Sequence, residues 1–208
     1  MGTLVLVVGT GRCGSTSLSH LLSLQDGARV THERYGHRVR WDCPSTLWPL
    51  RLWNDALIET ESVVGDAAFY WTPHIEYFLR LGEKYNRDVR IVGLVRPRDE
   101  VIASYCRWVG EKNHWTYHNG EEWEFDRWDH CYPVFRGKTR EEAIGLFWDR
   151  VMSKLQTVGY KEDRIDLFEM RELNNEIGVR AILNHIGIPK EDQNIEIEVR
   201  KNAGPEHA

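Results

Sequence analysis

A glycine-rich loop near the N-terminus carries residue types that bind anions. It reads Gly9-Thr-Gly-Arg-Cys-Gly-Ser-Thr16 and lies between an apolar run, Leu4 to Val8, and a stretch with helical spacing. At such a junction, backbone N–H groups and the positive end of a helix converge on a negative group. The loop therefore predicts a cradle for a phosphate-like ligand, the alternative being a strand-to-helix turn without a ligand.

The cation of this loop distinguishes it from a nucleoside triphosphate site. The spacing of Gly9 and Gly14 matches the Walker A pattern, but Ser15 stands where the Walker lysine would be, and Arg12 is the cation of the loop. A triphosphatase also places an acidic residue after a neighbouring apolar strand to hold magnesium, whereas the run from Ile91 to Val95 is followed by arginine. These features favour a site that binds an anion without a metal.

Two motifs together resemble sulfotransferases that use 3'-phosphoadenylyl sulfate (PAPS). Residues 10–18 are similar to the loop that surrounds the 5'-phosphosulfate of the donor in that family. Residues 93–105 resemble its second signature, in which a strand ends in Arg, here Arg96, and Ser104 follows eight residues later on a helix. The resemblance implies that Arg96 and Ser104 clasp the 3'-phosphate. It assigns the 5'-phosphosulfate to Arg12, Cys13, Gly14, Ser15, Thr16 and Ser17.

The resemblance extends to the C-terminal part of the chain. Residues 164–188 are similar to a strand, an acidic turn and a final helix of the family, with Glu169 and Leu173 in corresponding positions. Residues 199–204 resemble a short form of the basic loop over the 3'-phosphate, which assigns Arg200 and Lys201 to that group. Pro97 directly follows Arg96, one residue earlier than usual, and predicts a tighter turn. The implied donor is PAPS, and the implied product is 3',5'-adenosine bisphosphate (PAP).

Three residues are candidates for the catalytic base, which must accept the proton of an acceptor hydroxyl as sulfur is attacked. The first is Glu33, in Thr31-His-Glu-Arg34, because related enzymes carry a catalytic Glu after the second strand. The second is Asp66, which matches an acidic residue of a Gly-Glu-Lys-Ser-Pro segment although the Lys and Pro are absent here. The third is His32, since one branch of the family uses histidine. Arg12 would stabilise the charge of the leaving phosphate.

Strands and helices alternate along the rest of the chain. Short apolar runs predict strands over 62–66, 89–95 and 164–170. Helical spacing follows over 74–85, 141–158 and 177–186, and a first helix begins at Ser15. This order predicts an α/β fold with a parallel sheet between helices. The resemblance refines this fold class to the P-loop NTPase-like fold of sulfotransferases.

An aromatic-rich segment at about 105–140 is predicted to be an insertion or lid. Its aromatic residues are candidates for stacking on an acceptor, the alternative being a hydrophobic cluster that anchors the loop. His114 and His118 have the spacing of metal ligands, but no Glu partner accompanies them, so we expect no metal. Repulsion would favour a neutral or cationic acceptor, a small molecule or carbohydrate, because residues 113–132 hold one basic side chain and five acidic ones.

Composition limits the remaining function classes. The 208 residues are 41% hydrophobic and carry a net charge of -5, which indicates one globular domain over 1–208 and excludes collagen or coiled coil. No global positive field would attract nucleic acid or an anionic membrane. Without a signal peptide or a long apolar run, the chain is expected to be cytoplasmic. Two alternatives stay open: a P-loop nucleoside or small-molecule kinase, and a non-catalytic nucleotide-binding protein.

Overall fold

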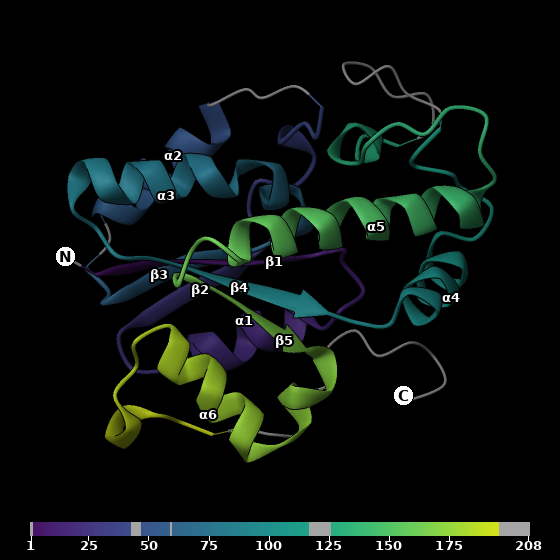
Figure 1. Ribbon diagram of the computed structural model, residues 1–208. Helices are drawn as coiled ribbons and strands as arrows, with labels where there is room; N and C mark the ends of the chain where they lie inside the picture. Colours follow the sequence, from purple (N-terminus) through teal and green to yellow (C-terminus); the bar gives the residue numbers. More distant parts are fainter. Residues whose placement is uncertain (1, 43–46, 59, 117–125, 196–208) are drawn as a thin grey trace.

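A parallel sheet forms the centre of the protein. The computed structural model describes residues 2–42, 47–58, 60–116 and 126–195. Within them, five parallel strands lie in the order β2-β3-β1-β4-β5 (Figure 1). The strands are β1 (Thr3–Gly9), β2 (Ala28–His32), β3 (Val63–Ala67), β4 (Val89–Val95) and β5 (Ile165–Glu169).

The middle strand, β1, is buried from Leu4 to Gly9, as its unbroken apolar sequence predicts for a strand covered on both faces. Its side chains alternate between the two cores of the protein, so each face of the sheet is sealed by a different set of helices. β3 and β4 flank β1, with Gly9 paired to Leu94 at its end. In open parallel sheets, ligands bind at the carboxyl ends of the strands where the chain turns to opposite sides.

Helices cover both faces of the sheet (Figure 1). One face packs against α1 (Ser15–Ser23) and α6 (Glu176–His185). The other packs against α2, α3 and α5, while α4 follows the end of β4 and contributes Val101 and Tyr105 to the same core. These helices are α2 (Leu47–Ile58), α3 (Ile75–Tyr85), α4 (Arg98–Val109) and α5 (Arg140–Gly159).

The α/β class and the parallel sheet between helices confirm the prediction. The expected strands and helices are present within two residues of their predicted ends. Helix α2 was not predicted, although its Pro49 lies in the first turn, where a proline is tolerated. Short 3₁₀ helices complete the connections: η1 (Gly36–Arg38), η2 (Phe69–His74), η3 (Asp129–Cys131), η4 (Met170–Asn174) and η5 (Lys190–Asp192).

The aromatic segment packs into the larger core where the structure describes it. Trp115 and Tyr132 are buried and lie 4.8 Å apart between ring centroids, with Phe147 of α5 beside both. This part of the segment therefore matches the alternative of an anchoring hydrophobic cluster. Residues 117–125, which include His118, lie outside the described residues. Along the described chain, no helix is long and apolar enough to cross a membrane.

Candidate functional site

The glycine loop after β1 turns its backbone into an unusual shape. Gly11, Arg12 and Gly14 all have positive φ angles, of 75°, 54° and 91°. A side chain at Gly11 would also place its Cβ 2.5 Å from the Tyr105 hydroxyl, so only glycine fits there. Left-handed residues in such a loop turn successive N–H groups toward one side, which is the geometry of an anion-binding nest.

Three neighbouring elements hold this loop in place. The Tyr105 hydroxyl of α4 donates to the Thr10 carbonyl at 2.5 Å. Arg96, at the end of β4, donates through Nη1 to the Arg12 carbonyl at 2.9 Å. A Cβ at Gly14 would meet Leu173 of η4 at 3.0 Å, so this turn also closes against the loop. The contribution of Tyr105 was not predicted from the sequence, although Tyr105 directly follows the predicted site residue Ser104.

The first turn of α1 presents hydroxyl groups next to His32. Gly14 is the N-cap and no side chain caps the helix, while Ser15 and Thr16 both place a hydroxyl oxygen 3.1 Å from His32 Nε2. Burial lowers the pKa of His32, so its imidazole is neutral near pH 7. His32 therefore lies beside the predicted phosphosulfate residues, with Ser17 in the same helical turn, and orients the hydroxyls of that turn.

The two predicted anion-binding motifs meet at the Arg12 side chain. Its Nε donates to the Ser104 hydroxyl at 3.4 Å, and its guanidinium lies 5.4 Å from the centroid of the Trp108 ring. Arg96 also donates through Nε to Glu100 at 3.0 Å, in addition to its bond to the loop. The structure thus gathers two arginines and a serine hydroxyl at the carboxyl edge of β1 and β4. This cluster can bind two anionic groups of one ligand.

Glu33 directly follows β2 on the other side of this edge. It is a left-handed residue with φ of 50°, and its N–H donates to the Ala67 carbonyl at 3.1 Å. Burial and the negative charge of Asp66 raise the pKa of Glu33 to about 7, against the lowering effect of Arg12. A carboxyl group with a pKa near neutrality can both accept and release a proton at physiological pH.

Asp66, the second candidate base, is closed off from any acceptor. It is fully buried, and its carboxylate accepts hydrogen bonds from four groups on β2, η2 and the turn after β2. A buried group whose lone pairs are occupied in this way holds structure together. The prediction that Asp66 could act directly on an acceptor therefore does not fit its surroundings.

The remaining predicted residues divide into three groups. Cys13 is buried with its side chain in the α1 core, and burial raises its pKa to about 11, so the thiol stays protonated and only its backbone can face a ligand. Arg200 and Lys201 lie outside the described residues. His114 pairs with buried Asp129 at 2.6 Å. Among the described residues, no group of three or more His, Cys, Asp or Glu side chains could hold a metal ion.

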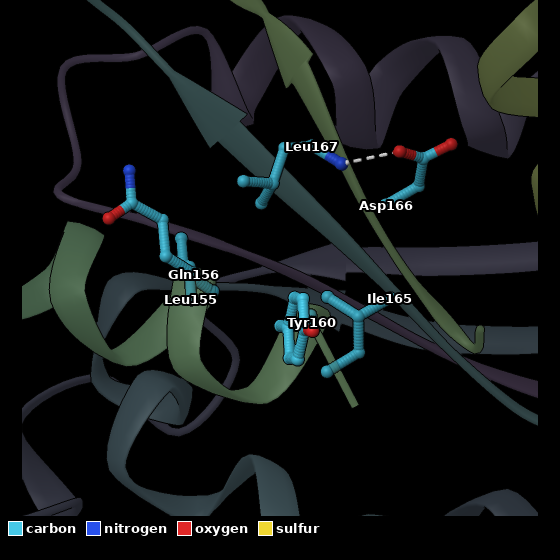
Figure 2. A pocket seen from close by; sticks show the side chains of 7 residues that line it. Leu155, Gln156, Tyr160, Ile165, Asp166 and Leu167 are labelled. Atoms are coloured by element: carbon cyan, nitrogen blue, oxygen red, sulfur yellow. Dashed lines mark hydrogen bonds between the residues drawn. The ribbon is translucent and has the colours of Figure 1, made fainter. Parts of the chain in front are cut away.

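A hollow at the edge of the sheet lies apart from this site. Figure 2 shows it between the end of α5 and β5, where the Leu167 N–H donates to the Asp166 carboxylate at 2.8 Å. No residue of the glycine loop, of the Glu33 turn or of α4 contributes to its lining. The lining residues are Leu155, Gln156, Gly159, Tyr160, Ile165, Asp166 and Leu167.

Comparison with known proteins identifies the fold. No family model matches the sequence, and no curated protein matches it. The solved structure of a sulfotransferase from Alicyclobacillus acidocaldarius aligns with 97% of this chain and 86% of that chain, with a TM-score of 0.54 and 18% sequence identity. The chain has the sulfotransferase fold.

Two further solved structures were also found. A sulfotransferase domain from the curacin biosynthetic pathway gives a TM-score of 0.49 at 13% identity, over 93% of this chain and 76% of that chain. A sulfotransferase domain from the Synechococcus PCC 7002 olefin synthase gives a TM-score of 0.46 at 14% identity, over 90% of this chain and 74% of that chain. The sulfotransferase fold of the Alicyclobacillus protein is the one that the two anion-binding motifs predict.

Proposed function

We propose that this protein is a sulfotransferase that moves a sulfuryl group from PAPS to a hydroxyl or amine of an acceptor. One observation carries the proposal: a carboxyl group with a pKa of about 7, Glu33, lies at the same sheet edge as the cluster of Arg12, Arg96 and Ser104. A nest for a phosphosulfate beside a neutral-pH base is the pair of groups that sulfuryl transfer to a hydroxyl requires.

The donor would be held through its two anionic ends. The N–H groups of the glycine loop and the hydroxyls of Ser15 and Thr16 suit the 5'-phosphosulfate. Ser104 and Arg96 suit the 3'-phosphate, which would replace Glu100 as the partner of the Arg96 guanidinium. Arg12 lies between these groups and can neutralise charge on either.

The transfer then needs alignment, one base and charge stabilisation. An acceptor oxygen forms a bond to sulfur while the bond between sulfur and the 5'-phosphate oxygen of PAPS breaks. The acceptor proton passes to Glu33, and PAP leaves with its new phosphate charge held by Arg12 and the loop. Such a reaction asks the protein chiefly to align its groups and to stabilise charge.

The acceptor is proposed to be a neutral or cationic small molecule or carbohydrate. Of the five acidic residues in 113–132, Asp126 pairs with Lys112 at 2.9 Å, and the buried Asp129 contacts His114. The repulsion of polyanions would thus come from the other three, Glu121, Glu122 and Glu124, which lie outside the described residues.

The test is a calorimetric titration of the full chain with PAP and, separately, with ATP, each with and without magnesium. We expect PAP to bind without the metal and Arg96→Ala to abolish this binding. Arg90→Ala is the matched control, because Arg90 lies on the same strand and pairs with Asp88 at the opposite edge. Magnesium-dependent binding of ATP together with indifference to PAP would overturn the proposal in favour of a kinase.

A further inference from the structure

We propose that Asp66 is a positioning residue, whose buried carboxylate clamps the turn that carries Glu33 and does not itself meet the acceptor. The inference rests on the proposed function, in which Glu33 is the base. It gives Asp66 a role that the order of residues along the chain does not show, because Thr31 and Asp66 lie 35 residues apart and are joined only where β2 pairs with β3.

One oxygen of Asp66 holds the chain on both sides of Glu33. Its Oδ1 accepts from the Thr31 hydroxyl at 2.7 Å and from the Arg34 N–H at 3.1 Å. These donors lie two residues before Glu33 and one residue after it. Glu33 itself has the left-handed backbone that a residue other than glycine adopts only when its surroundings impose it. The two bonds on a single oxygen hold this conformation together with the bond from the Glu33 N–H to the Ala67 carbonyl.

The other carboxylate oxygen of Asp66 is connected to the turn that carries Glu33 by residues of η2. Oδ2 accepts from Trp71 Nε1 at 2.7 Å and from the Tyr70 hydroxyl at 3.4 Å. The Tyr70 oxygen in turn accepts from the N–H groups of Tyr35 and Gly36, at 3.2 and 3.1 Å. The turn is therefore bound to Asp66 directly and through Tyr70.

All four groups on Asp66 are donors, and this pattern fits an ionised carboxylate. Two of the four groups, the Arg34 N–H and Trp71 Nε1, can only donate, and their bonds favour the ionised form against the burial that raises the pKa of Asp66. The negative charge so maintained lies beside Glu33 and opposes its ionisation, whereas Arg12 favours it. The clamp thus fixes where Glu33 lies and also strengthens it as a base.

Apart from Arg12, Asp66 and the Arg34–Asp55 ion pair, the titratable groups around Glu33 are neutral near pH 7. Burial raises the pKa of each tyrosine and of the cysteine that interact with its charge, and burial lowers the pKa of the neighbouring His32. The Arg34 guanidinium pairs with Asp55 at 3.4 Å. The neutral groups are Tyr70, Tyr105, Cys131 and Tyr132.

The test measures the titration of the Glu33 carboxyl group and needs neither PAPS nor the substrate that accepts the sulfuryl group. The full chain is labelled with carbon-13 at its Glu carboxyl groups, and the Glu33 signal is assigned by its loss in Glu33→Gln. We expect a titration midpoint near 7 in the wild type. In Asp66→Asn the midpoint should fall by roughly half a pH unit or more, because the neighbouring negative charge is gone.

Asp55→Asn is the matched control. It removes a carboxylate of the same region, which accepts from the Tyr35 hydroxyl at 2.6 Å but does not contribute to the pKa of Glu33. Its Glu33 midpoint should equal that of the wild type. An unchanged midpoint in a folded Asp66→Asn variant would overturn the inference.

Should Asp66→Asn fail to fold, Thr31→Val carries the test, since it removes one clamp bond and keeps the size of the side chain. We expect its Glu33 midpoint to move toward the ordinary value as the loosened turn admits water, and an unmoved midpoint would refute the clamp. Calorimetry with PAP separates the two proposals. Absence of PAP binding by the wild type refutes the sulfotransferase, whereas the midpoint tests Asp66 alone.

Discussion

The two loops at the carboxyl edge of the sheet are anchored in opposite ways. The glycine loop is held through its carbonyl oxygens, which accept from Tyr105 and Arg96. The turn after β2 is held through its N–H groups, which donate to Asp66 and Tyr70. Because the glycine loop is held by its carbonyl oxygens, its N–H groups remain available to bind an anionic ligand. The turn after β2 is held by the buried Asp66, whose negative charge raises the pKa of Glu33.

This contrast assigns different sensitivities to the two sides of the site. The loop relies on backbone geometry and on arginine, whose charge does not change at physiological pH. The turn relies on a carboxyl group that titrates near pH 7. Changes in shape should therefore damage the loop, whereas changes in charge or pH should damage the turn.

The largest effect is expected from Glu33→Gln. Removing the base should slow sulfuryl transfer by roughly 10²–10⁴-fold, the usual contribution of general base catalysis. PAP should still bind, because Glu33 does not belong to the loop. The assay is transfer of radiolabelled sulfuryl from PAPS to a panel of phenols, saccharides and amines, with exposed Glu111→Gln as the control. Equal transfer rates in wild type and Glu33→Gln would remove Glu33 from the mechanism.

Gly11→Ala tests the shape of the loop. The added Cβ would lie 2.5 Å from the Tyr105 hydroxyl at a φ of 75°, so we expect loss of PAP binding and a destabilisation of roughly 2 kcal/mol or more. Gly110→Ala is a matched control with a positive φ but no atom within 4 Å of the added Cβ. It should keep PAP binding, at a cost in stability of roughly 1–3 kcal/mol from its backbone conformation. Equal effects of the two substitutions, measured by calorimetry and thermal unfolding, would contradict the role of the loop shape.

The pH dependence of stability tests the turn. The folded protein holds the pKa of Glu33 at about 7, above the ordinary 4.5, so folding favours the protonated form. The resulting stabilisation is complete below pH 4.5 and is lost as the pH rises through 7. Thermal unfolding should therefore show Glu33→Gln more stable than the wild type by roughly 1–3 kcal/mol at pH 8, with little difference near pH 4. A difference in stability that does not change with pH would argue against a half-buried Glu33 that titrates near pH 7.

Tyr105→Phe should give the smallest effect. It removes one hydrogen bond to the Thr10 carbonyl and leaves the buried ring in place. We expect PAP affinity to fall about fivefold, which corresponds to about 1 kcal/mol. Calorimetry measures this loss, and the Glu33 midpoint should stay unchanged. A loss of PAP binding as complete as that in Gly11→Ala would show that the hydroxyl binds the ligand directly.

The fold could be predicted from the sequence because the patterns that indicate its strands and helices involve residues close together in the chain. The apolar run before Gly9 and the alternation of strands with helices decide the sheet and its layers. The glycine loop was recognisable for the same reason, since its geometry depends on adjacent residues. Helix α2 escaped prediction because its burial against α3 and β3 comes from contacts distant in the chain.

The organisation of the Glu33 turn could not be predicted in the same way. Asp66 was a candidate base from its position at a strand end, but its four partners come from β2, η2 and the intervening turn. Only the pairing of β2 with β3 brings Thr31 next to it. Trp108 was likewise a candidate for stacking on an acceptor, whereas its ring lies under the Arg12 guanidinium.

The most direct test asks whether the glycine loop and the Glu33 turn face the same ligand. The carbon-13 titration of Glu33 is repeated with saturating PAP. Its 5'-phosphate would neutralise Arg12, which lowers the pKa of Glu33 in the free protein. We expect PAP to move the Glu33 midpoint to higher pH and Arg96→Ala to abolish this shift. PAP that binds without moving the midpoint would show that the base and the donor site are separate.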